Sequence, residues 1–163
     1  MEHLTQKAKE VSEEIHRMKK EVADTLRNEM RGEFAKIFED NPELRWFSWV
    51  QYTPYFNDGE SCVFSVIDSI RYQWGGNPDD LEEIDYYDFP EISKWDIPYI
   101  RGEKESSWRS EIDPTEVLAA DALEPVINLL SAIDDDIFLE VFGDHAMVIV
   151  TKDGIDIEEY EHD

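Results

Sequence analysis

The sequence predicts an α+β fold with a long N-terminal helix, an antiparallel β-sheet of about five strands, one further helix packed on the sheet, and an acidic insertion. Three observations support this prediction. Apolar residues recur every three or four positions over residues 1–40, which is the period of a helix. Residues 44–72 and 137–160 are rich in apolar and aromatic residues that alternate with polar ones, as in strands. An acidic region without a clear period lies between them.

Residues 1–41 are interpreted as a helical arm that ends at Asn41-Pro42, because a residue before proline leaves the helical region. Between Leu4 and Val22 the apolar stripe approximates a heptad repeat, so it needs an apolar partner. We expect the arm either to dock on the chain's own body or to pair with a second copy as a homodimer. The residues that would make this contact are Leu4, Val11, Ile15, Met18 and Val22.

The region after the arm predicts a β-hairpin over residues 44–72. Its first strand is Leu44–Tyr52, where the odd step between Trp46 and Trp49 suggests a bulge. A turn segment separates it from the second strand, Ser61–Tyr72. Cys62, which lies in this second strand, is expected to be a buried core thiol.

Residues 75–113 are interpreted as an acidic insertion with short helical turns, since a structureless loop of this length is uncommon. A helix then begins at Asp113-Pro114, which Pro125 would kink or split and Asp134–Asp136 would end. A meander of three C-terminal strands follows, over residues 137–142, 145–151 and 155–160. Residues 42–163 therefore form one acidic α+β domain.

Charge is the unusual feature of this 163-residue chain, which has 40 acidic and 15 basic residues and a formal net charge of −25. Residues 1–40 hold ten acidic and eight basic residues, so the body carries nearly all of the excess. Duplex DNA carries one charge per about 1.7 Å, so the chain has as much charge as about 42 Å of DNA, close to its own expected diameter of about 40 Å. This acidity argues against direct binding to nucleic acid or anionic membranes, and predicts a protein partner with a basic surface.

Two acidic segments and four aromatic residues are the candidate partner-binding residues, because carboxylates can face a basic groove while aromatic side chains act as anchors. The aromatic candidates are Tyr86, Tyr87, Trp95 and Trp108. The acidic candidates are Asp79, Asp80, Glu82, Glu83, Asp85 and Asp88 in the insertion, and Asp156, Glu158, Glu159, Glu161 and Asp163 at the C-terminus.

The sequence contains no phosphate-binding loop and no serine in a nucleophile elbow, and paired carboxylates cannot be singled out among so many. We therefore expect a non-enzymatic protein without catalytic residues or a cofactor. The single cysteine, with no signal peptide or membrane span, favours a cytoplasmic protein. A less favoured hypothesis is a metal-binding protein or metal-dependent hydrolase that uses Asp144, His145 and His162, with Asn57 or Asp58.

Short segments of the chain, Gln51–Glu60 and Phe142–His145, look like parts of bacteriophage proteins. In size, charge and build the chain resembles the small acidic proteins that bacteriophages make against host enzymes, including DNA-mimic inhibitors. The resemblance implies that it inhibits a host nucleic-acid-binding protein, in the host cytosol, by presenting a DNA-like negative surface. An alternative is that the arm inhibits another host machine, such as an ATP-dependent protease. The resemblance carries over no catalytic residue.

Overall fold

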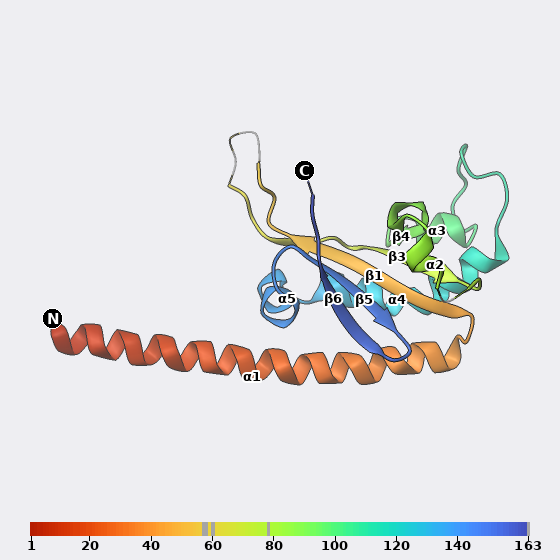
Figure 1. Ribbon diagram of the computed structural model, residues 1–163. Helices are drawn as coiled ribbons and strands as arrows, with labels where there is room; N and C mark the ends of the chain where they lie inside the picture. The colour runs from red at the N-terminus through yellow and green to blue at the C-terminus, as the bar shows by residue number, and fades with distance from the viewer. Residues whose placement is uncertain (57–58, 60, 78, 163) are drawn as a thin grey trace.

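The computed structural model describes residues 1–56, 59, 61–77 and 79–162 and confirms an α+β fold (Figure 1). Its helices are α1 (Glu2–Asp40), α2 (Asp80–Glu83), the 3₁₀ helix η1 (Tyr86–Asp88), α3 (Ile97–Ile100), α4 (Pro114–Ala132) and α5 (Asp135–Phe142). Its strands are β1 (Leu44–Tyr52), β2 (Ser65–Val66), β3 (Ser69–Trp74), β4 (Glu91–Ser93), β5 (Ala146–Thr151) and β6 (Gly154–Glu159).

The strands form one antiparallel sheet in the order β4-β3-β1-β5-β6, with β2 also paired to β1. The antiparallel pairing of β1 with β3 confirms the predicted hairpin, although its second half begins later than the sequence suggested. The predicted bulge is present in β1, but the register shifts between Leu44 and Trp46. Trp46 and Trp49 therefore point to opposite faces of the sheet by ordinary alternation.

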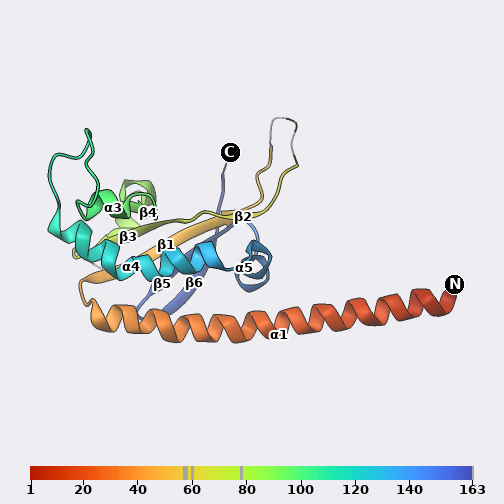
Figure 2. The same cartoon turned by 180° about the vertical axis from the view of Figure 1, so that it is seen from behind.

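One face of the sheet, here called the inner face, packs against α1, α4 and α5 (Figure 2). Phe47 and Trp49 of β1 lie at its centre and are almost completely buried. Phe47 contacts Phe34 and Phe38 of α1, while Trp49 contacts α5. The opposite face, here called the outer face, carries Trp46, Ser48, Val50 and Tyr52 of β1, and the segment 79–90 partly covers it.

Helix α1 confirms the predicted arm, but only its second half docks on the body. Contact with the core begins at Ala23 and continues through Met30, Phe34 and Phe38. The expectation that the stripe from Leu4 to Val22 docks on the chain's own body is wrong, because these side chains are exposed and the N-terminal half of α1 projects beyond the sheet (Figure 1).

The predicted strand over residues 137–142 is wrong, because this segment is helix α5. The acidic residues before it do not simply end α4: Asp134 is the N-cap residue of α5, and Asp135 and Asp136 lie in its first turn, where the helix dipole favours negative charge. Phe138, Val141 and Phe142 have the three-and-four spacing of a helix and are buried. The C-terminus therefore supplies two strands, and β2 and β4 bring the sheet to six.

Two smaller expectations are also wrong. Cys62 is exposed and precedes β2, because only Ser65–Val66 of its segment pair with β1. Pro125 does not split the second long helix, since α4 continues through it as one element, with Pro125 on its exposed side.

The insertion contains the predicted short helices, and ion pairs fix its second half to α4. Arg101 donates hydrogen bonds to Asp121 and Glu124, both at 2.7 Å. Arg109 forms a bidentate pair with Glu116. Strand β4, which the sequence did not predict, pairs with β3 and makes the insertion part of the sheet.

Candidate functional site

The outer face of the sheet holds a packed aromatic group built on Trp46. Its indole lies edge-on to Phe89, with ring centroids 4.8 Å apart, and stacks with Tyr86 at 6.2 Å. The indole N–H donates a 2.9 Å hydrogen bond to Gln73, so the buried polar atom is satisfied. Ile149 completes this group, which fixes the insertion against the centre of the sheet.

Tyrosine hydroxyls extend this group across the sheet. Tyr86 shares a 2.9 Å hydrogen bond with Ser48, and burial raises the pKa of its phenol. Tyr87, its neighbour in the insertion, donates a 3.2 Å hydrogen bond to the hydroxyl of Tyr160, just beyond β6. Burial and this hydrogen bond raise the pKa of Tyr160. The two predicted acidic segments therefore meet at Tyr87 and Tyr160.

Arg71 occupies the middle of this surface and carries its own counter-charge. The guanidinium lies 5.5 Å and 5.3 Å from the ring centroids of Tyr86 and Tyr87. It forms a 2.6 Å ion pair with Glu91 of β4 and donates a 2.8 Å hydrogen bond to the carbonyl of Phe89. A pocket of about 180 Å³ beside Arg71 is lined by these tyrosines and Tyr52. Because Glu91 neutralises the charge of Arg71, Arg71 does not offset the negative charge of the other carboxylates on the outer face.

Most of the predicted acidic candidates are exposed, and two of the four aromatic candidates, Tyr86 and Tyr87, belong to the outer face. Asp79, Glu82, Asp85, Asp88, Asp156, Glu158, Glu159 and Glu161 are exposed, and Asp80 is half-buried. Glu83 belongs to α2, and Asp163 lies outside the described residues. On β6, Asp156 and Glu158 pair with Ile149 and Met147 of β5, which places both carboxylates on the outer face.

The other two aromatic candidates do not join the group around Trp46. Trp95 precedes α3 and contacts Lys94, whose ammonium lies 5.0 Å from the ring centroid. Trp108 packs against Tyr99, with centroids 5.6 Å apart, and against Arg109. Both indoles are exposed. The structure therefore places them around α3, with separate contacts.

The two C-terminal histidines do come together, as their strand positions suggested. The Nδ1 atom of His145 lies 3.0 Å from the Nε2 atom of His162, and the ring planes are 16° apart. The ring of Tyr55 stacks on both imidazoles, at 4.9 Å and 4.4 Å. One of these two nitrogens donates the hydrogen bond and the other accepts it, so the lone pair of the accepting nitrogen is not available to a metal ion.

This geometry does not form a metal centre in the described part of the chain. Among those residues, no group of three histidine, cysteine or carboxylate side chains is arranged to hold an ion. Asp144 instead accepts hydrogen bonds from the backbone N–H and hydroxyl of Thr53, at 2.8 Å and 2.7 Å. Asn57 and Asp58, the other candidate ligands, lie outside the described residues.

We expect the contribution of Asp144 to stability to depend on pH. Burial tends to raise the pKa of its carboxyl, but the hydrogen bonds from Thr53 and His145 outweigh this and hold the pKa below its usual 3.8. The stabilisation is therefore complete above the unfolded-state pKa and lost as pH falls through the lower folded-state value. In thermal unfolding, Asp144→Ala should lose at most about 1 kcal/mol at pH 7, and less at pH 2. An equal loss at both pH values would contradict this assignment.

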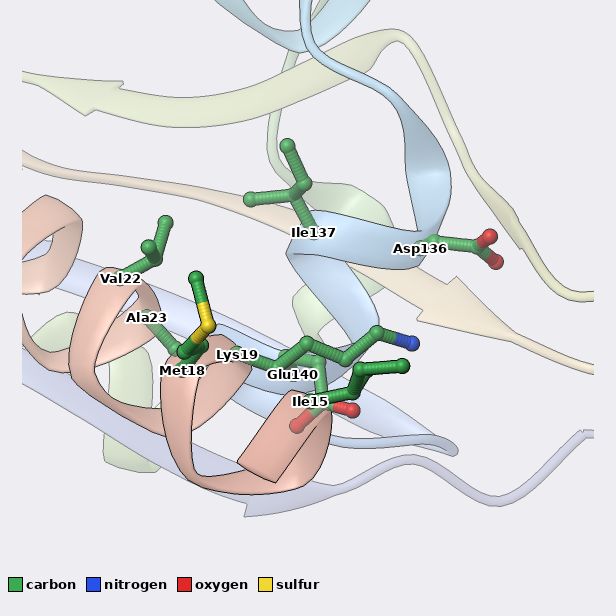
Figure 3. Close-up of a pocket in the computed structure, with 8 residues that line it drawn as sticks. All are labelled: Ile15, Met18, Lys19, Val22, Ala23, Asp136, Ile137 and Glu140. Carbon is green, nitrogen blue, oxygen red and sulfur yellow. The ribbon is translucent and has the colours of Figure 1, made fainter. Parts of the chain in front are cut away.

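The predicted contact residues of the arm lie on its free half. Leu4, Val11, Ile15, Met18 and Val22 are each between 48% and 63% exposed. The last three line an apolar groove of about 350 Å³ between α1 and α5, whose other wall includes Ile137 and Glu140 (Figure 3). The stripe thus remains without a partner within the described chain.

Sequence reasoning missed several residues of the outer face, chiefly Arg71, Ser48, Tyr52 and Tyr160. Their alternation along the strands was the available signal, because residues 46, 48, 50 and 52 share one side of a strand. What the alternation did not reveal is which segment covers that side.

Comparison with known proteins assigns the chain to no family. No protein-family model, curated protein or solved structure matches it. In the described residues, no helix has the length and apolar character needed to cross a membrane.

Proposed function

We propose that the chain is a non-enzymatic interaction protein whose outer face binds the cationic surface of a nucleic-acid-binding protein and excludes nucleic acid from it. The observation that carries this proposal is the contact between Tyr87 and Tyr160, which joins the acidic insertion to the acidic strand β6. Both segments carry exposed carboxylates, and the aromatic side chains beside them are already fixed by packing, so little side-chain freedom is lost on binding.

The resemblance to phage-encoded inhibitors supplies the setting of this proposal. The target would be a host protein in the host cytosol, and inhibition would be competitive with nucleic acid. The body's negative charge speeds the encounter through long-range attraction, which salt weakens.

We expect binding to depend on where the carboxylates lie, as well as on net charge. One variant neutralises outer-face residues (Asp85→Asn, Asp88→Asn, Asp156→Asn and Glu158→Gln), and a matched control neutralises four exposed residues of α1 (Glu2→Gln, Glu13→Gln, Asp24→Asn and Glu29→Gln). Each exposed ion pair between a carboxylate and the partner contributes about 0.2–1 kcal/mol to binding. The outer-face variant should therefore bind the partner roughly tenfold more weakly than the control.

The probe is the fraction of a bacterial lysate that is retained on immobilised duplex DNA. The proteins of this fraction should bind the immobilised chain and dissociate from it when duplex DNA is added. Their binding should weaken as salt rises from about 50 to 200 mM. Binding that is indifferent to salt, or that both variants weaken equally, would contradict the proposal.

A second candidate function uses the exposed stripe of α1. The chain would inhibit a larger machine, such as an ATP-dependent protease, by inserting its arm through apolar contacts. Deleting residues 1–22 separates the two candidates, because these residues make no contact with the buried core, whereas Ala23 and the residues after it do. Binding through the outer face should survive this deletion, and binding through the arm should not.

A further inference from the structure

The free half of α1 carries a complete heptad repeat. Met1, Ala8, Ile15 and Val22 recur every seven residues, and Leu4, Val11 and Met18 recur every seven on the adjoining turn, as at the a and d positions of a coiled coil. After Val22 the apolar residues are spaced by four, and this part of the helix packs on the body. The repeat therefore ends where contact with the body begins.

We propose that residues 1–22 of two chains pair as an antiparallel coiled coil, so that the protein is a homodimer. A second copy is the expected occupant because the two sides of the contact would be identical and each would present the apolar residues that the other needs. The arm is nearly neutral, with eight basic and ten acidic residues in positions 1–40, so two arms can approach. This inference does not depend on the proposed function of the outer face.

The direction of pairing follows from which side of α1 the body occupies. Ile15, Met18 and Val22 line the same groove as Ile137 of α5, so the repeat and the body lie on one side of the helix (Figure 3). Because α1 is a single helix through Asp40, a parallel second helix would continue past Val22 into the space that α5 and the sheet fill. An antiparallel helix ends there instead.

One register pairs every repeat position from Leu4 to Val22 and stops at the body, with Met1 opposite Thr25. Val22 faces Leu4 of the second copy, Met18 faces Ala8, and Ile15 faces Val11. Leu4 of the second copy then enters the apolar groove between α1 and α5. Lys7 lies near Glu21 of the other chain, which gives two attractive pairs per dimer, while Glu14 meets its own copy in one repulsive pair between them. The two acidic bodies lie at opposite ends, where their mutual repulsion is weakest.

The first test is the mass of the full chain by sedimentation equilibrium. At about 100 μM the wild type should have twice the 19.2 kDa of one chain, and Ile15→Glu should be monomeric. Gln6→Glu makes the same charge change on the opposite side of the helix and should remain dimeric. Because Ile15 is half exposed, the variant should keep the thermal stability of the body. A monomeric wild type would overturn the proposal.

The second test determines direction by disulfide formation in a Cys62→Ser background. Val11→Cys and Ile15→Cys chains should cross-link when mixed but not separately, because these positions face each other only in the antiparallel pair. Cross-linking of each variant with itself would indicate a parallel pair and overturn the proposed direction. Neither test contains a cationic partner, so dimerisation and the function of the outer face can fail independently.

Discussion

Replacing Gln51 by leucine is expected to destabilise the fold by about 3 kcal/mol, because it leaves buried polar groups without partners. Gln51 is fully buried at the end of β1. Its amide nitrogen donates to the carbonyls of Phe138 and Gly143, at 3.0 Å and 2.6 Å, and its oxygen accepts a 3.3 Å hydrogen bond from the indole of Trp49. One side chain therefore connects β1 to the middle of α5, at Phe138, and to its end, at Gly143.

The measurement is urea-induced unfolding, compared with Gln6→Leu as the same substitution at an exposed position. The control should change the free energy of unfolding by less than about 0.5 kcal/mol. An unchanged midpoint for Gln51→Leu would show that the bonds to Phe138 and Gly143 contribute nothing to stability.

Trp49→Ala should be still more damaging, with a loss of about 3–5 kcal/mol. Its indole is 1% exposed and contacts Phe34 of α1 and both phenylalanines of α5, with centroids 5.3 Å from Phe142 and 6.4 Å from Phe138. Removing it opens a cavity where two helices meet the sheet, and the surrounding rings collapse only partly.

Trp95→Ala is the matched control for this substitution, because the indole of Trp95 is 72% exposed. It should change the free energy of unfolding by less than about 0.5 kcal/mol in the same denaturation experiment. Similar losses for the two tryptophans would contradict the assignment of Trp49 to the core.

The long helix, the β1–β3 hairpin and the α+β class follow from periodicity, because α1, β1 and β5 each carry a clear pattern over many residues. Residues 137–142 are too few for their spacing to distinguish a helix from a strand. A short apolar run is compatible with a buried strand and with a buried helix, and here Asp134 before the run and Gly143 after it favour the helix. Periodicity also does not tell what covers an apolar stripe, which is why the sequence leaves both docking on the body and pairing with a second copy open for the free half of α1.

The candidate site was only partly predictable, for a related reason. Acidic residues in the insertion and the last strand are visible in the sequence, but their meeting depends on Tyr87 and Tyr160, which are 73 positions apart. The approach of His145 to His162 was suggested by the expected strand order. Their mutual hydrogen bond depends on side-chain orientations that spacing does not specify.

Strand β6 is an edge strand of the sheet, so its outer backbone groups could pair with a strand of another molecule. A sheet rich in aromatic and β-branched residues is prone to grow by recruiting strands from other molecules. A second copy of this strand that added in parallel and in register would align Asp156, Glu158 and Glu159 with identical carboxylates. We therefore expect concentrated solutions to resist fibril formation at neutral pH.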